Sequence, residues 1–149
     1  MFMAGVEDAI NNQLRLIREG SSRAATFAQK VRPAASSYIY LPVEDAPSGA
    51  KSKHEPDASF LHEDALYPGV IIEVSYSQKR KKLGRLAEDY LLDSEASVQV
   101  VVGLDIEYGR EASRKATLSV WRAHLAQTAD GDEWSVVQEI ADEVCPVLG

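Results

Sequence analysis

Cysteine is almost absent from this chain of 149 residues, which contains only Cys145. A single cysteine cannot form an internal disulfide, so we expect a reducing, intracellular compartment, either nuclear or cytoplasmic. The sequence also has no apolar run long enough to span a membrane. Its first residues carry Glu7 and Asp8, where a secretory signal would be apolar. We therefore expect a protein that acts outside membranes and outside the secretory pathway.

Several short motifs with well-understood chemistry are missing as well. The sequence contains no GxGxxG pattern, no P-loop pattern and no GxSxG pattern, so the usual signatures of dinucleotide binding, nucleotide-phosphate binding and hydrolase serine chemistry are absent. The three histidines, His54, His62 and His124, lack the spacing of zinc ligands. We predict that these histidines are surface residues.

Positive charge is scarce overall but concentrated in one place. The chain carries 23 acidic and 16 basic residues, for a net charge of −7, which disfavours a protein that coats nucleic acid generally. The length and the 45% hydrophobic content predict one folded domain over residues 1–149. A local basic cluster nevertheless lies at Lys79, Arg80, Lys81, Lys82 and Arg85.

The hydrophobic patterns predict an α/β fold with a mixed central β-sheet flanked by helices. Apolar residues recur every three or four positions over two stretches, residues 4–19 and 78–92. The first helix presents one apolar face, made by Val6, Ile10, Leu14 and Ile17, and the second presents one made by Leu83, Leu86, Ala87, Tyr90 and Leu91. Short apolar or alternating runs predict strands, at residues 36–42, 54–61, 70–76, 98–105, 116–122 and 134–137.

Some segments of this pattern are less regular. Residues 43–54 and 62–69 are expected to be loops, and Asp130-Gly131-Asp132 indicates a turn. The run 116–122 has the alternation of an edge strand. Residues 138–144 fit either a helix or a strand.

Glu73 is the most informative residue because it lies inside the apolar strand 70–76. Both faces of that strand are mostly apolar, so we expect a central strand and a buried carboxylate. Burial of a carboxylate is costly unless it is paired, hydrogen-bonded or bound to a metal. An ion pair with Arg85 or a lysine remains open. Asp57 on a nearby strand favours a metal, because two buried acids repel and a divalent cation removes the conflict.

The basic cluster occupies an unfavourable position in its helix. Its positive side chains crowd the helix N-terminus, where each misplaced charge costs roughly 0.3–1 kcal/mol. Lys81 and Arg85 also repel each other at i, i+4 spacing. A solvated basic turn would tolerate this arrangement in salt, whereas contact with an anionic nucleic-acid backbone would explain it. We favour the contact with nucleic acid.

The pair Pro56-Asp57, followed sixteen residues later by Glu73-Val74-Ser75, resembles the PD-(D/E)XK superfamily. The order helix, strand, strand with PD, strand with ExK, helix and strand is similar too. More narrowly, the segments EPDASF, PGVIIEVSYSQ, VVVGLDIEY and ATLSVWR resemble a family of fungal proteins of unknown function. That family is related to bacterial restriction-endonuclease-like proteins. The resemblance covers roughly residues 5–122.

This resemblance implies a restriction-endonuclease-like fold and Mg²⁺- or Mn²⁺-dependent hydrolysis of DNA phosphodiester bonds. Asp57 and Glu73 would be the catalytic metal ligands, and Glu7 would match an additional acid that some members use. The lysine of the pattern should stand two residues after Glu73, where this chain has Ser75. Lys79 or Lys82 of the following helix would then supply the missing positive charge.

The resemblance also implies roles for the remaining polar residues. Ser75 and Gln78 are further candidates for the site, while Arg80, Lys81 and Arg85 would contact the nucleic-acid backbone. DNA is the expected partner, and a second copy of the chain is a candidate partner. The missing lysine and the acidic overall charge favour one alternative, a catalytically degenerate module that binds protein or nucleic acid. Another alternative is a scaffold in which Glu73 only pairs with Arg85.

Overall fold

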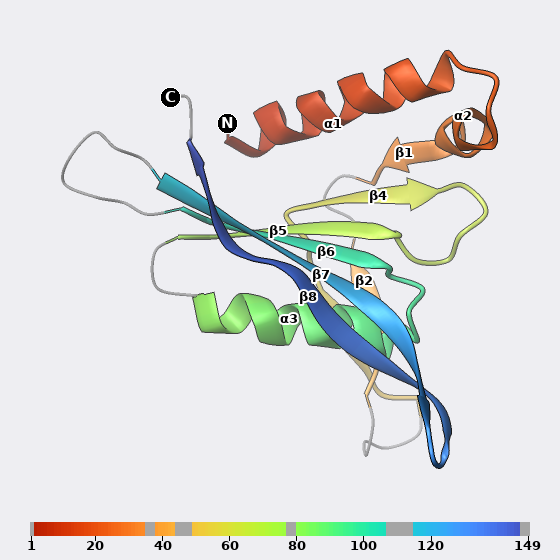
Figure 1. Cartoon of the computed structure of the whole chain (residues 1–149), viewed down its shortest axis with the longest axis vertical. Coiled ribbons are helices and arrows are strands. Elements are labelled where there is room, and N and C mark those ends of the chain that lie inside the picture. Colours follow the sequence, from red (N-terminus) through yellow and green to blue (C-terminus); the bar gives the residue numbers. More distant parts are fainter. Residues whose placement is uncertain (1, 35–37, 44–48, 77–79, 107–114, 147–149) are drawn as a thin grey trace.

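The computed structural model describes residues 2–34, 38–43, 49–76, 80–106 and 115–146. The predicted helices at 4–19 and 78–92 correspond to α1 (Phe2–Arg18) and α3 (Arg80–Asp93), and the predicted strand 70–76 coincides with β5 (Val70–Tyr76). Figure 1 shows the elements in space. In chain order they are α1 (Phe2–Arg18), α2 (Arg23–Ala28), β1 (Val31–Pro33), β2 (Ile39–Pro42), β3 (Lys51–His54), β4 (Ala58–His62), β5 (Val70–Tyr76), α3 (Arg80–Asp93), β6 (Val100–Ile106), β7 (Lys115–Thr128) and β8 (Gly131–Pro146).

A mixed six-stranded sheet organises the fold, with the strand order β1-β4-β5-β6-β7-β8. β5 and β6 are parallel, and the other neighbouring pairs are antiparallel. Parallel neighbours need a crossover connection, and α3 lies in the connection between β5 and β6. The predicted mixed central sheet with flanking helices is confirmed, because α3 covers one face of the sheet and α1 covers the other.

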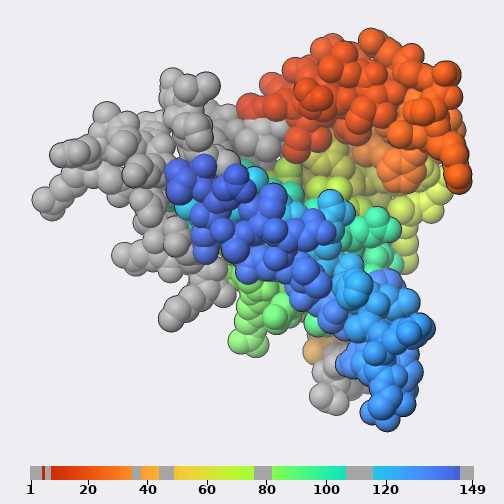
Figure 2. Space-filling view, viewed as in Figure 1, coloured from red at the N-terminus to blue at the C-terminus, as the bar shows by residue number. Residues whose placement is uncertain are grey.

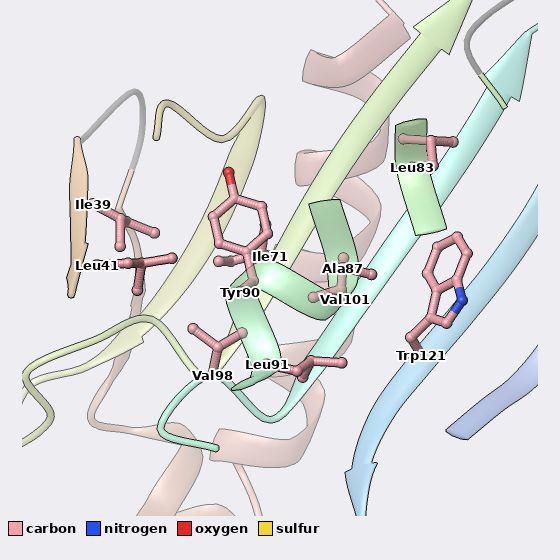
Figure 3. Close-up of a cluster of buried hydrophobic side chains, with 10 residues drawn as sticks. All are labelled: Ile39, Leu41, Ile71, Leu83, Ala87, Tyr90, Leu91, Val98, Val101 and Trp121. Atoms are coloured by element: carbon pink, nitrogen blue, oxygen red, sulfur yellow. The ribbon is translucent and has the colours of Figure 1, made fainter. Parts of the chain in front are cut away.

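The sheet face beneath α3 holds the larger buried cluster (Figure 3). The predicted apolar stripe of α3 meets side chains from β5, β6 and β7, and the β2–β3 hairpin closes one side of the cluster. This packing explains why the residues from β2 are buried although β2 belongs to a separate two-stranded sheet. The members are Ile39, Leu41, Ile71, Leu83, Ala87, Tyr90, Leu91, Val98, Val101 and Trp121.

α1 packs against the opposite face through Ile10 and Leu14. The period of two along β5 separates the two clusters, since Ile71 belongs to the α3 side and Ile72 to the α1 side. The predicted stripe of α1 is wrong at Ile17, which is 43% exposed. The buried residues under α1 are Val31, Ala58, Phe60, Ile72 and Leu104.

The N-terminal strands differ from the prediction. β3 lies inside the segment 43–54, which was expected to be a loop, and it pairs with β2 away from the main sheet. Its residues are polar, so hydrophobic periodicity gives no signal for this strand. β1 forms the edge next to β4, and its three residues are too short to show a period. β4 also begins at Ala58 and not at residue 54.

The other end of the sheet is longer than predicted. β7 is not an edge strand, because it is hydrogen-bonded to β6 on one side and to β8 on the other. β8 extends over both the predicted strand 134–137 and the ambiguous residues 138–144. The predicted turn joins β7 to β8, and Gly131 there has a φ of 114°, which favours glycine. The hairpin tip projects away from the helices (Figures 1 and 2).

Candidate functional site

Asp57 and Glu73 lie opposite each other at the end of the β4–β5 ladder. The ladder pairs Ala58 with Ile72 and Ser59 with Ile71. Continuing this register by one residue sets Asp57 against Glu73. Directly opposed residues have Cβ atoms about 4.5–5.5 Å apart and point to the same face of a sheet. The two acids that the sequence singled out are therefore neighbours in the structure.

The Asp57 carboxylate is oriented by the backbone of β5. Asp57 is exposed, and its Oδ2 accepts a hydrogen bond from the Val74 N–H at 2.7 Å. A charged acceptor makes this bond stronger than an ordinary one between neutral groups. The carboxylate thus has a fixed position but keeps a side open to solvent.

The Glu73 carboxyl is held by a hydrogen bond from a side chain of α3. Glu73 is 8% exposed, and the Tyr90 hydroxyl donates a hydrogen bond of 2.7 Å to its Oε1. Tyr90 is itself buried within the cluster under α3. A buried tyrosine hydroxyl generally needs a partner, so this bond satisfies both groups. Burial also raises the pKa of Tyr90 well above its ordinary value, so Tyr90 remains a hydrogen-bond donor.

Burial is the largest cause that raises the pKa of Glu73 from 4.5 to about 8. The Tyr90 hydrogen bond lowers this pKa, because it stabilises the carboxylate. The Asp57 charge raises it, and a hydrogen bond between the two acids raises it further. Near neutral pH Glu73 is therefore mostly a neutral acid beside Asp57. The pair retains a proton that a divalent cation would displace.

Ser75, which stands where the resemblance predicts a lysine, lies in the interior. It is 5% exposed, and its Oγ donates a hydrogen bond of 2.8 Å to Asp105 Oδ1. Asp105 is the register partner of Ser75 on the parallel strand β6 and is also buried. The lysine position is thus filled by a hydroxyl that is paired with a third acid.

The basic residues of the prediction lie in or next to α3. Lys82 and Arg85 are exposed on this helix. The groups that act on Glu73 are Tyr90 and Asp57, so the alternative in which Glu73 only pairs with Arg85 is not supported by its described contacts. The side chains of Arg80 and Lys81 lie outside the described part of the structure, as do residues Gln78 and Lys79.

Glu7 lies in α1, and its side chain is also outside the described part of the structure. α1 packs on the face of the sheet that carries Ile72, whereas the carboxyl of Glu73 faces α3. The role of Glu7 in the site stays a prediction. Within the described residues, no group of three or more acids, histidines or cysteines could hold a metal, so the two carboxyls stand as a pair.

Three residues of this region were not predicted as part of a site. The hydrophobic period predicts Tyr90 only as a member of the apolar stripe, although a tyrosine among aliphatic positions indicates a buried hydroxyl that needs a partner. Asp105 ends an apolar run, which was the available signal for a buried acid. His54, predicted to be a surface residue, is half-buried, with its ring centroid 5.2 Å from that of Tyr90 and its Nε2 2.9 Å from Ser52 Oγ. Of the other two histidines, His62 is also half-buried and His124 is exposed.

Comparisons of the chain with protein-family models, with curated proteins and with solved structures found no match. In the part of the chain that the structure describes, no helix is both long and apolar enough to cross a bilayer.

Proposed function

We propose that the protein is a metal-dependent nuclease of the restriction-endonuclease-like type, in which Asp57 and Glu73 hold a divalent cation. The observation that carries this proposal is the direct opposition of an exposed and a buried carboxyl that together retain a proton. Mg²⁺ and Mn²⁺ bind carboxylate oxygens. A cation between the two acids would replace the proton and remove their repulsion.

The order of the central elements supports the same proposal. α1, β1, β4, β5, α3 and β6 occur in this order along the chain, with α2, β2 and β3 interspersed; Asp57 lies just before β4 and Glu73 within β5. This is the order helix, strand, strand with PD, strand with ExK, helix and strand of the resemblance. β1 takes the place that the prediction gave to residues 36–42. α2 and the β2–β3 hairpin are insertions into this order, and β7 and β8 follow it.

The donor set of the pair fits Mg²⁺, which is commonly held by one or two carboxylates and keeps several of its waters. The Val74 N–H fixes Asp57, and the Tyr90 hydroxyl fixes Glu73, so both ligands are oriented before an ion arrives. When bound, the ion would activate a water molecule and stabilise the charge that develops on the phosphate. The exposed side of Asp57 gives access for the ion.

Positive charge next to this pair is proposed to come from α3. Lys82 would take the electrostatic role of the lysine that is missing at Ser75, and Arg85 would contact the DNA backbone. Both side chains are exposed, as contacts with a large anionic partner require. Removing either charge should weaken DNA binding and reduce its dependence on salt.

A second candidate function is a degenerate module that has the same fold and binds protein or nucleic acid without cleavage. The observation that favours it is the hydrogen bond between Ser75 and Asp105, because it fills the lysine position with buried, mutually satisfied groups. Substituting lysine at position 75 would bury a new charge at a site that is 5% exposed, which is costly. This chain therefore does not preserve the usual arrangement at that position.

The test is cleavage of supercoiled plasmid by the parent protein in Mg²⁺ or Mn²⁺, compared with Glu73→Gln and Asp57→Asn. Loss of one metal ligand should reduce the cleavage rate by about 100-fold or more, since even groups that only orient ligands contribute 10–100-fold. Glu88→Gln, on the exposed side of α3, is the matched control and should cleave like the parent.

Two results would separate the candidates. Absence of cleavage by the parent, together with duplex binding that is weakened by Lys82→Ala and Arg85→Ala, would overturn the nuclease and support the module. Cleavage that persists at parental rates in Glu73→Gln would contradict the assignment of the metal ligands.

A further inference from the structure

A cavity of about 280 Å³ lies beside the candidate site, between the start of α3 and the last three strands of the sheet. It opens on the same face of the sheet as Glu73, because Gly103, which borders it, is the register partner of Glu73 on β6. The cavity is therefore separate from the Asp57–Glu73 pair but close to it. Its polar lining is formed by Asp105, Thr117, Ser119, Gln138 and Asp142.

Trp121 closes the cavity on the side of the hydrophobic core. The residue lines the cavity and belongs to the buried cluster under α3. Its ring lies directly against β6 at Gly103, where a Cβ atom would stand only 2.7 Å from Cζ3. Glycine at this position thus allows the indole to form the apolar wall.

A β-bulge brings an acid to the polar side of the cavity. Leu118 pairs with Glu143 but Val120 pairs with Ile140, so β8 carries an extra residue against β7. Asp142 lies at this irregularity with a φ of 46°, and bulges redirect side chains in this way. Its N–H donates to Ser119 Oγ at 3.0 Å, and Ser119 Oγ donates to Asp142 Oδ1 at 3.5 Å. The bulge and Ser119 hold the carboxylate at the cavity.

Thr117 is the feature that points to a ligand. It is 7% exposed, and its Oγ1 has no hydrogen-bond partner in the described structure. It is the register partner of Asp105 on β6, and both residues line the cavity. Buried hydroxyls nearly always have a partner, and an unsatisfied one destabilises the protein. A ligand in this cavity would supply the interaction that Thr117 lacks.

The chemistry of the lining selects the class of ligand. Ser119, which lines the cavity, donates its proton to Asp142, so its hydroxyl oxygen is left to accept from or bind other groups. A carboxylate has about four lone-pair sites and accepts from several partners at once. Oxygen donors of this kind match hard cations. A water occupies about 30 Å³ of liquid, so the cavity has room for an ion with several of its waters.

We propose that this cavity is a second divalent-cation site, of the Mg²⁺ and Ca²⁺ class, with Asp105, Asp142, Thr117 and Ser119 as its oxygen ligands. The inference does not rest on the proposed function, because none of these residues belongs to the Asp57–Glu73 pair. It adds a site that the sequence did not indicate, since its acids come from strands that are distant along the chain.

The test uses Tb³⁺, a luminescent substitute for Ca²⁺, excited through tryptophan in the Trp134→Phe variant. This background removes the exposed tryptophan and keeps Trp121 at the cavity wall, so sensitised emission reports an ion bound there. Thr117→Val and Asp142→Asn should each weaken Tb³⁺ binding by about tenfold or more, and Ca²⁺ should displace Tb³⁺. Asp132→Asn, on the same strand as Asp142, is the matched control and should bind Tb³⁺ like the parent.

Folding defects are distinguishable from loss of the site. Thr117→Val removes a hydroxyl without a partner, so the cation-free Tm should stay the same or rise, and asparagine tolerates the backbone at position 142. Sensitised emission with parental affinity in both variants would overturn the proposal. Loss of that emission in Glu73→Gln, with full binding in the two cavity variants, would also overturn it.

Discussion

Glu73→Gln should change how the stability of the protein depends on pH. In the folded protein the pKa of Glu73 is about 8, compared with an ordinary value of 4.5. Between these two values the folded state keeps the proton and the unfolded state has lost it. The unfolding free energy therefore falls as pH rises through this window, and the contribution of Glu73 does not change below pH 4.5.

The size of this loss of unfolding free energy follows from the shift in the pKa of Glu73. One pKa unit corresponds to about 1.4 kcal/mol, so the loss reaches roughly 3 kcal/mol by pH 7 and at most about 4–5 kcal/mol above pH 8. Glutamine does not titrate, accepts the Tyr90 hydrogen bond and can donate to Asp57. At pH 8 we expect Glu73→Gln to be more stable than the parent by about 2–4 kcal/mol, with the two curves converging near pH 4.5.

The assay is urea unfolding at several values between pH 5 and 8, in chelator, followed by tryptophan fluorescence, to which the buried Trp121 contributes. Glu88→Gln, at an exposed position on α3, should have the pH dependence of the parent. Saturating Mg²⁺ should restore the unfolding free energy of the parent at pH 8, because an ion that binds only the folded state stabilises that state. The same Mg²⁺ should not stabilise Glu73→Gln in this way. Parallel curves for parent and Glu73→Gln at every pH would refute the buried, protonated carboxyl.

Three further substitutions test the surroundings of the site. Tyr90→Phe removes a hydrogen bond that favours the carboxylate of its partner, so the window of pH-dependent stability should extend above about pH 8 in the same unfolding series. Ser75→Ala leaves Asp105 with one hydrogen bond fewer in the interior and should cost about 1–3 kcal/mol in urea unfolding; an unchanged midpoint would contradict the described bond. Gly103→Ala places a Cβ atom 2.7 Å from the indole ring that packs there and should cost about 1–3 kcal/mol, whereas Gly5→Ala, in open space, should not destabilise the protein.

The meeting of Asp57 and Glu73 could be predicted because it depends on local features. β5 is marked by a continuous apolar run, and the segment with Asp57 is joined to it by a short connection. In such an antiparallel pair the connection and the apolar faces determine the register. Two acids on the same face near the open end of the pair then become neighbours. Knowledge of the remaining strands was not needed.

The partner of Glu73 was harder to predict because it depends on the rotation of α3. Arg85 stands five residues before Tyr90, which is about 140° around a helix, so the two side chains cannot point to the same carboxyl. Burial of the apolar stripe turns Tyr90 toward the sheet and leaves Arg85 exposed. The hydrophobic period of the sequence places Tyr90 in this stripe, but the period does not show which group its hydroxyl meets.

The cavity beside the site could not be predicted because it is built by long-range pairing. Thr117 faces Asp105 only through the β6–β7 register, and Asp142 reaches Ser119 only through a bulge in β8. Bulges give no reliable pattern in a single sequence. The same limit applies to β1 and β3, whose few or polar residues show no hydrophobic period.

The most direct test of the metal site is calorimetric titration of the protein with Mn²⁺ at pH 7, in buffers that differ in ionisation enthalpy. Because Glu73 is mostly protonated at this pH, the account predicts uptake of an ion with release of about one proton. Glu73→Gln and Asp57→Asn should both lose this proton-linked uptake. Binding without proton release in the parent, or unchanged proton-linked binding in both variants, would contradict the claim that these two carboxyls hold a divalent cation.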